Sequence, residues 1–134
     1  MFSNRCAILP LGLAGLALLL AGCAVLQSRS KGAEPMAAHV VYISDEYKNI
    51  NTDLSGESLA KVGIIQGSTF RARLGDNSID VFLGKGYKDV DRGEWVGLIE
   101  EDGTLQIAIS FGHAATVLDC AVGDTLYITP LEPR

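Results

Sequence analysis

The sequence has 134 residues, of which 48% are hydrophobic and 20% are charged, and its formal net charge at pH 7 is −5. This length accommodates one domain of ordinary size. The excess of acidic side chains argues against nucleic acid as a partner, because phosphate binding requires concentrated Lys and Arg. Of the three cysteines, Cys6, Cys23 and Cys120, two fall in the first 23 residues, so no disulfide framework is predicted and a hydrophobic core must hold the domain together.

The first 23 residues have the pattern of an export signal. One basic residue, Arg5, precedes an apolar run over residues 7–21, which is shorter than the roughly 20 residues that a membrane-spanning helix needs. The run ends in Leu20-Ala21-Gly22-Cys23, which resembles the lipobox of bacterial lipoproteins. The resemblance implies cleavage before Cys23 and acylation of its thiol. The alternatives are an ordinary signal peptide with a chance cysteine and an uncleaved anchor helix.

Residues 1–22 are therefore predicted to be a lipoprotein signal peptide, and residues 23–38 to be the lipidated cysteine and a flexible tether. The tether is composed mostly of small and polar residues without apolar periodicity. Several acyl chains on one cysteine bind a bilayer stably. Ala24 stands where a retention signal usually places Asp. We therefore expect a bacterial envelope protein that is anchored by lipid in the outer membrane and faces the periplasm.

Residues 39–134 are predicted to form a small all-β domain. Short runs of β-branched or alternating apolar residues are separated by Gly, Asp and Asn, and two helical patterns last about one turn each. Hairpin turns are predicted at Gly75-Asp76-Asn77 and Glu101-Asp102-Gly103. Such a series of short strands is typical of an antiparallel barrel or sandwich. The predicted strands are 40–43, 69–74, 78–83, 94–100, 105–110 and 125–129, and the helical turns are 58–62 and 113–118.

Side chains that carry chemistry are sparse in this domain. The histidines, His39 and His113, have no Cys, Asp or His at metal-ligand spacing, so no metal site is predicted. Asp89 and Asp91 lie in a predicted loop with too few further ligands for calcium. Ser55 and Ser58 have no nearby base, and no catalytic residue is predicted. Apolar neighbours surround Cys120, which favours a small buried hydrophobe over a thiol that pairs between chains.

Several short motifs follow one another through the domain. The first is Asp45-Glu46-Tyr47-Lys48-Asn49, followed after two residues by Thr52-Asp53. Later come Gly93-Glu94, Gly103-Thr104-Leu105-Gln106-Ile107-Ala108, Gly112-His113-Ala114-Ala115 and Gly123-Asp124. The series resembles the C-terminal domain of the S-adenosylmethionine hydroxide adenosyltransferases, the family that includes the chlorinases and fluorinases. The resemblance spans residues 40–129, and the alternative is a fortuitous match between two β-domains.

The resemblance implies an adenosyl-binding surface. An aromatic side chain would stack on adenine, an Asp and an Asn would hold the amino acid portion, and the Gly-x-Ala-Ala turn would contact the edge of the base. By match to these motifs, Tyr87 is the stacking residue and Asp45 holds an ammonium group. The implied ligand-binding residues are Asp45, Asn49, Tyr87, His113, Ala114 and Ala115.

Three departures separate the sequence from the family pattern. Lys48 replaces a Gly, which adds bulk where Gly allows close approach. Asp53 replaces an Asn, which changes what the site could hold, and Gln106 replaces a Glu. No counterpart of the family's N-terminal domain is seen, so half a site is predicted and no catalysis is expected from this chain alone.

These observations together favour a lipid-anchored, non-catalytic binding or interaction module in the cell envelope. Its predicted partners are the membrane, through the lipid on Cys23, and either an envelope protein or an adenosyl compound such as S-adenosylmethionine or adenosine. No cofactor is predicted. Two alternatives stay open. The chain could complete an adenosyltransferase or S-adenosylmethionine hydrolase site with a separate partner, or it could be a purely structural envelope lipoprotein.

Overall fold

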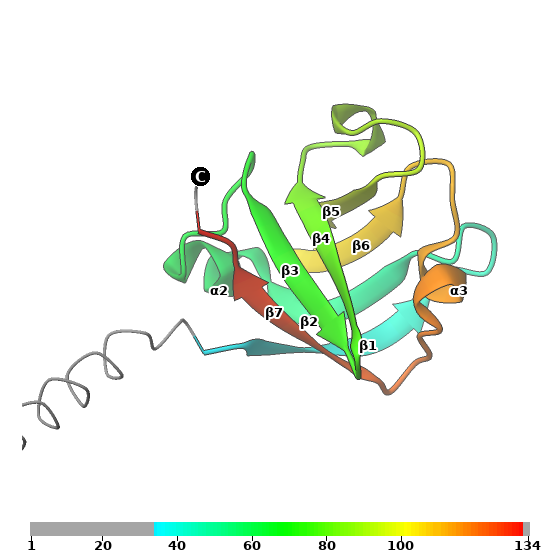
Figure 1. Ribbon diagram of the computed structural model, residues 1–134, viewed down its shortest axis with the longest axis horizontal. Helices are drawn as coiled ribbons and strands as arrows, with labels where there is room; N and C mark the ends of the chain where they lie inside the picture. Colours follow the sequence, from blue (N-terminus) through cyan, green and yellow to red (C-terminus); the bar gives the residue numbers. More distant parts are fainter. Residues whose placement is uncertain (1–33, 133–134) are drawn as a thin grey trace, which may run out of the picture. The chain divides into compact units, whose positions relative to one another are not determined.

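The computed structural model describes residues 34–132, which form a closed barrel of seven strands (Figure 1). The order around the barrel is β1-β2-β6-β5-β4-β3-β7, so the first and last strands pair and close it. The predicted all-β class is confirmed. The strands are β1 (Met36–Ile43), β2 (Ile50–Ser55), β3 (Thr69–Leu74), β4 (Asn77–Leu83), β5 (Trp95–Ile99), β6 (Thr104–Ile109) and β7 (Thr125–Pro130).

Three short helical segments connect the strands. Helix α2 (Gly56–Lys61) follows β2, the 3-10 turn η1 (Tyr87–Asp89) links β4 to β5, and helix α3 (Ala114–Leu118) follows β6. Ser55 caps α2, because its hydroxyl accepts a hydrogen bond from the amide of Ser58 at 3.1 Å. Figure 1 shows α2 and the C-terminal strand end on one side of the barrel, and α3 with the β1–β2 loop on the other.

One pair of neighbouring strands departs from the predicted antiparallel pattern. Strands β4 and β5 run parallel, with Phe82 opposite Val96 and Leu83 opposite Gly97. A parallel pair needs a crossover connection rather than a hairpin. The segment that carries η1 makes this crossover, so Tyr87 leaves the sheet and stands beside it.

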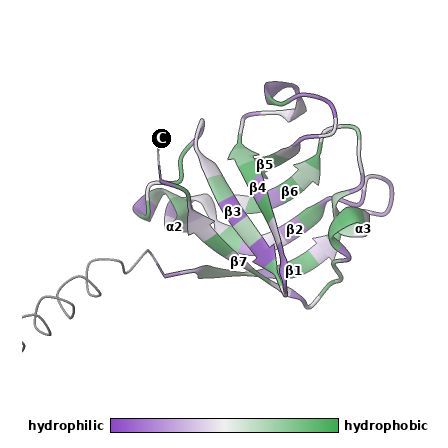
Figure 2. Cartoon of the chain, viewed as in Figure 1, coloured by the Kyte–Doolittle hydropathy of each residue, from purple (hydrophilic) through white to green (hydrophobic). Residues whose placement is uncertain are grey.

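The core of the barrel is built by alternation along the strands. In β3, Phe70 and Ala72 are fully buried, whereas Arg71 and Arg73 are exposed, and the same alternation of hydrophobic and hydrophilic residues is visible in Figure 2. Complete burial of a side chain the size of Phe70 contributes about 1.5–3 kcal/mol. A Cβ at Gly97 would lie 3.2 Å from the Phe70 ring, so a glycine makes room for the largest core side chain. The described strands pair among themselves around a core of their own side chains, so the domain is self-contained.

The predicted domain boundary differs from the structure by a few residues. Strand β1 begins at Met36, and residues 36–39 pair with β7, so the end of the predicted 23–38 tether belongs to the barrel. Ala38 is fully buried, which explains why small residues that resembled a tether stand there. The predicted signal peptide, Cys23 and the remainder of the tether lie outside the described residues. Within residues 34–132, the helices are all too short or too polar to span a membrane.

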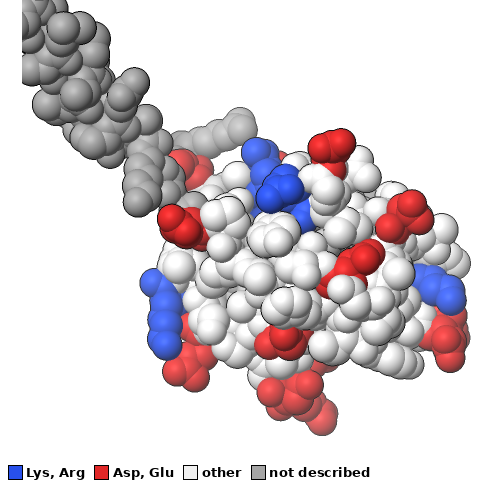
Figure 3. Space-filling view, turned by 90° about the horizontal axis from the view of Figure 1, so that it is seen from below, with Lys and Arg blue, Asp and Glu red and all other residues white. Residues whose placement is uncertain are grey.

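The prediction for Cys120 is confirmed, because its side chain belongs to the core cluster. Burial, reinforced by Asp124 and Asp119, raises the pKa of the thiol to about 11. The thiol is therefore protonated at neutral pH and behaves as a small apolar group. On the surface, acidic side chains are spread over the face in Figure 3, whereas Lys and Arg occupy a few separate places.

Candidate functional site

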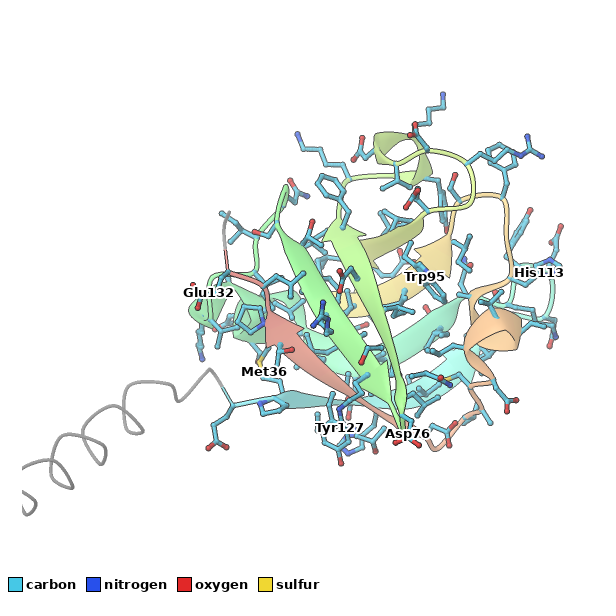
Figure 4. The ribbon with its side chains drawn as sticks, in the orientation of Figure 1. Met36, Asp76, Trp95, His113, Tyr127 and Glu132 are labelled. Carbon is cyan, nitrogen blue, oxygen red and sulfur yellow. The ribbon has the colours of Figure 1, made fainter. Side chains whose placement is uncertain are left out.

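A pocket of about 530 Å³ lies beside the β1–β2 loop, η1 and the connection from β6 to α3. Its volume is within the range of small-molecule sites. His113, labelled in Figure 4, marks the side of the pocket next to α3. The lining residues come from these three segments and are mainly apolar or aromatic: Tyr47, Asn49, Tyr87, Ile109, Phe111, Gly112 and His113.

Three aromatic side chains of the pocket are exposed to solvent. Tyr47 is 58% exposed, Tyr87 is 43% exposed and Phe111 is 78% exposed. The guanidinium of Arg92 lies 4.3 Å from the centre of the Phe111 ring, a cation–π contact that holds this ring at the rim. A hydrogen bond with the nearby Glu46 raises the pKa of Tyr47, so the phenol of Tyr47 is protonated at neutral pH. Clustered exposed aromatic groups around a concavity are typical of binding surfaces.

Beneath the aromatic rings lies a set of hydrogen-bonded side chains, which we call the amide network: Asn49, Asn51, Tyr87 and Gln106. The Tyr87 hydroxyl donates to Oε1 of Gln106 at 3.1 Å and accepts from Nδ2 of Asn49 at 3.0 Å. Nε2 of Gln106 donates to Oδ1 of Asn51 at 3.0 Å. Asn49 and Gln106 are both buried. The network holds the phenol by both its donor and its acceptor, so Tyr87 offers chiefly its ring to a ligand.

The β1–β2 loop that presents Tyr47 and Asn49 is tightly bonded. The Asn49 amide donates to Oγ of Ser44 at 2.9 Å, and the Ser44 amide donates to the Asn49 carbonyl at 3.2 Å. Between them, Lys48 has a left-handed backbone with φ of 55°. A non-glycine residue there costs about 1–2 kcal/mol. The glycine of the family pattern is therefore explained by backbone conformation, and Lys48 does not line the pocket.

The connection after β6 is shaped by Gly112. A Cβ at this position would lie 2.5 Å from Cγ2 of Ile109, so the Ile109 side chain would have to shift to admit it. The preceding Phe111 has φ of 59°, which is rare for a bulky residue. Strained backbone of this kind is concentrated at functional sites.

The structure brings three of the six predicted ligand-binding residues to the pocket, namely Asn49, Tyr87 and His113. Ala114 and Ala115 are buried in the core, and the Ala115 amide donates to the Lys48 carbonyl at 2.9 Å. Asp45 is exposed and is not among the lining residues. The ligand-binding role of all six residues stays a prediction.

The replacement of Asn by Asp53 does not alter the pocket. Asp53 is exposed on β2, where its carboxylate accepts hydrogen bonds from the amide of His39 at 2.8 Å and pairs with the imidazole at 2.9 Å. The backbone hydrogen bond from His39 lowers the pKa of Asp53. The expected change in what the site could hold therefore has no basis at this position.

Several lining residues were not predicted from the sequence. Tyr47 is part of the first motif and Gly112 of the fourth, but Phe111 and Ile109 belong to none of the motifs. The exposure of Phe111 arises from the turn after β6, which residue types alone do not reveal. The involvement of Gln106 and Asn51 follows from the pairing of β2 with β6, which places Asn51 opposite Gln106.

No group of three or more metal-ligating side chains occurs within residues 34–132. Asp89, which lies in the loop with too few further ligands for calcium, has a structural role. Its Oδ2 accepts hydrogen bonds from the amides of Lys85 at 2.6 Å and Gly86 at 3.2 Å. This carboxylate therefore stabilises the connection that carries Tyr87.

Comparison with known proteins agrees with this architecture. The sequence pattern of the SAM hydroxide adenosyltransferase C-terminal domain matches residues 38–127. An uncharacterized conserved protein from Thermotoga maritima has a similar structure, with a TM-score of 0.65 and 26% sequence identity over 73% of this chain and 39% of that chain. No curated protein matches the chain.

A conserved hypothetical protein from Thermus thermophilus shares the fold. The TM-score is 0.51 at 19% sequence identity, over 72% of this chain and 36% of that chain. The barrel thus corresponds to less than half of the length of either solved structure.

Proposed function

Because the chain belongs to the SAM hydroxide adenosyltransferase C-terminal domain family, we propose that it is a lipid-anchored, extracytoplasmic module whose pocket binds the adenosyl group of a small molecule. The observation that carries the proposal is the combination of an exposed aromatic pocket with a buried amide network beneath it. Alone, the module is expected to bind without catalysis.

The chemistry of the pocket suits a neutral heteroaromatic group. The Tyr87 hydroxyl is engaged by Asn49 and Gln106, so the ring is held in place for stacking, which contributes about 0.5–1.5 kcal/mol beyond buried area. The lining contains no Lys or Arg. A nucleoside fits these properties better than a nucleotide, whose phosphates need cationic partners.

The first experiment is calorimetric titration of residues 33–134 with adenosine and with S-adenosylmethionine. We expect saturable binding that Tyr87→Ala weakens at least tenfold. The matched control is Tyr127→Ala, which removes a comparably exposed tyrosine on β7 that lies under Arg73 and away from the pocket. Absence of heat with both ligands, or equal loss in the two variants, contradicts the proposal.

The anchoring part of the proposal is tested separately in bacterial cells. Incorporation of labelled palmitate into the full chain is expected, and Cys23→Ser is expected to abolish it and release the protein from membranes. Cys120→Ser is the control, because that thiol is buried in the barrel. Labelling that survives Cys23→Ser contradicts anchoring at this residue.

A second candidate function is a subunit that completes an adenosyl site with a separate protein. It is supported by the exposed aromatic side chains at the pocket, Tyr47 and Phe111. It is also supported by the length of the two similar solved structures, of which this chain covers 39% and 36%. A photo-crosslinking amino acid at position 111 is expected to capture one protein in the cell envelope, and the same group at Ile65, also exposed but outside this pocket, is the control. Equal capture from both positions contradicts this function.

A further inference from the structure

We propose that Gln106 is a positioning residue that fixes which atom of the Asn49 side chain faces the pocket. As a result, the site would prefer a ligand that presents an N–H donor there, such as the 6-amino group of adenine, over one that presents a carbonyl, such as the 6-oxo group of hypoxanthine. The inference rests on the proposed adenosyl-binding function and adds a selectivity to it.

The direction of the amide network is set by a backbone group. The Asn49 carbonyl can only accept a hydrogen bond, and Nδ2 of Asn51 lies 3.5 Å from it. This orientation turns Oδ1 of Asn51 toward Gln106, where it accepts from Nε2 at 3.0 Å. The amide of Gln106 is thereby oriented with Oε1 on the side of Asn49 and Tyr87.

Gln106 then determines the orientation of Asn49. Its Oε1 lies 3.4 Å from Nδ2 of Asn49 and 3.1 Å from the Tyr87 hydroxyl, which donates to it. Nδ2 of Asn49 also donates to the Tyr87 oxygen at 3.0 Å. Nδ2 of Asn49 thus faces both acceptors of the network, and a reversed amide would place its oxygen against Oε1 of Gln106.

Oδ1 of Asn49 is the remaining atom, and it has no hydrogen-bond partner among residues 34–132. Every completely buried side-chain oxygen or nitrogen of these residues has a partner, so this oxygen must reach the surface. Asn49 is only 6% exposed and lines the pocket, so the pocket is where its oxygen is accessible. The site therefore presents a single oriented acceptor in an otherwise aromatic wall.

An oriented acceptor discriminates between ligands. An amino group on the ligand satisfies Oδ1, whereas a carbonyl at the same place leaves two acceptors facing each other without a proton between them. Sites that use a specific hydrogen bond discriminate more strongly than apolar pockets do. We expect residues 33–134 to bind adenosine at least tenfold more tightly than inosine, with purine riboside, which has neither group, in between.

The decisive variant is Gln106→Met, which preserves side-chain length and removes both hydrogen-bonding functions. Asn49 is then free to reverse its amide, and the adenosine-to-inosine affinity ratio is expected to fall below threefold. Gln106→Glu is the conservative variant, because its carboxylate still accepts from Asn49 and Tyr87. Its second oxygen cannot donate to Oδ1 of Asn51, so the Asn51 amide has to turn and donate to it instead. We expect the ratio to recover in that variant. An unchanged ratio in Gln106→Met, or an equal affinity for the two nucleosides in the unchanged chain, overturns the inference.

An NMR measurement tests the network without any ligand. The side-chain N–H groups of Asn49 are expected to be protected from solvent exchange, and Gln106→Met is expected to remove that protection while the backbone amides of β2 and β6 keep theirs. Unprotected Asn49 N–H groups in the unchanged domain contradict the inference. If adenosine does not bind but protection is observed, the proposed function fails and the positioning role of Gln106 survives.

Discussion

Two hollows on opposite sides of the barrel differ in character, and the smaller of the two carries the features of a binding site. The second hollow, near α2 and the end of β7, has a volume of about 920 Å³, against about 530 Å³ for the pocket beside Tyr87. It contains an ion pair, Arg71 with Asp80, whose side chains are 48% and 51% exposed. It has neither aromatic lining residues nor buried amides. The volume of a hollow therefore indicates a binding site less well than the polar side chains beneath it do.

The polar groups of the second hollow serve the chain itself. Oγ of Ser68 accepts from the Ile65 amide at 3.2 Å and donates to the Gly63 carbonyl at 3.4 Å, which closes the loop after α2. In the pocket, by contrast, the network leaves one acceptor of Asn49 unused. A hydrogen-bonding atom that is held in one orientation and has no partner in the protein is a mark of a ligand site.

The largest effect is expected from Gly112→Ala, which adds a methyl group to a residue that lines the pocket. The new Cβ would displace Ile109, a lining residue, and overpacking of this kind destabilises by about 1–3 kcal/mol. Adenosine binding should be lost as well. Gly86→Ala is the control, because its Cβ would meet no atom within 4 Å and its φ is −165°. Chemical denaturation of both variants makes the measurement, and equal stabilities would refute the steric argument.

Tyr87→Phe separates the ring from its hydroxyl. The free energy of unfolding is expected to fall by about 1 kcal/mol, because Asn49 and Gln106 lose a shared partner. Adenosine affinity should change less than in Tyr87→Ala, since the ring remains. A loss of binding as large as that in Tyr87→Ala would show that the hydroxyl, rather than the ring, makes the decisive contact.

A smaller effect is expected in the second hollow. Asp80→Asn removes the ion pair with Arg71, and exposed pairs contribute less than about 1 kcal/mol. Adenosine affinity should be unchanged. A marked loss of adenosine binding in this variant would place the ligand in the larger hollow and reverse the comparison.

The smallest effect is expected at Asp53, another exposed carboxylate paired across strands. Because the His39 amide lowers the pKa of Asp53 in the folded protein, its stabilising contribution is present above the unfolded value of about 3.9 and is lost as pH falls through the folded value. Asp53→Asn should therefore be less stable at neutral pH by under about 1 kcal/mol. The gap should close as the pH falls through the lowered pKa of Asp53 in the folded protein. Thermal unfolding across this range measures it, and a gap that widens on acidification would contradict the assignment.

Much of the barrel could be predicted because its strands alternate strongly. Thr69–Leu74 was predicted at its observed bounds, since Phe70 and Ala72 point inward between arginines. Strand β2 was not predicted, because Asn51 and Asp53 alternate with a buried Thr52 and make the segment resemble a loop. The parallel β4–β5 pair was also missed, since strand direction depends on the crossover rather than on local pattern.

The site was less predictable than the fold. Family motifs contain Asn49, Tyr47 and Gly112, and match to the family placed Tyr87, whereas the packing of β2 against β6 brings Asn51 and Gln106 together. The exposure of Phe111 depends on a left-handed turn and on Arg92 above its ring. These relations are tertiary, and no property of a single residue indicates them.

Pairing of β1 with β7 has a consequence for folding kinetics. Met36 lies opposite Ile128, so the barrel joins its first strand to its last and cannot close until the whole domain is available. Such distant pairing makes folding slow relative to a chain with local contacts. It also brings the two strand ends together, so a short linker between them and a cut at the Gly75-Asp76 turn should yield a circular permutant with the same barrel.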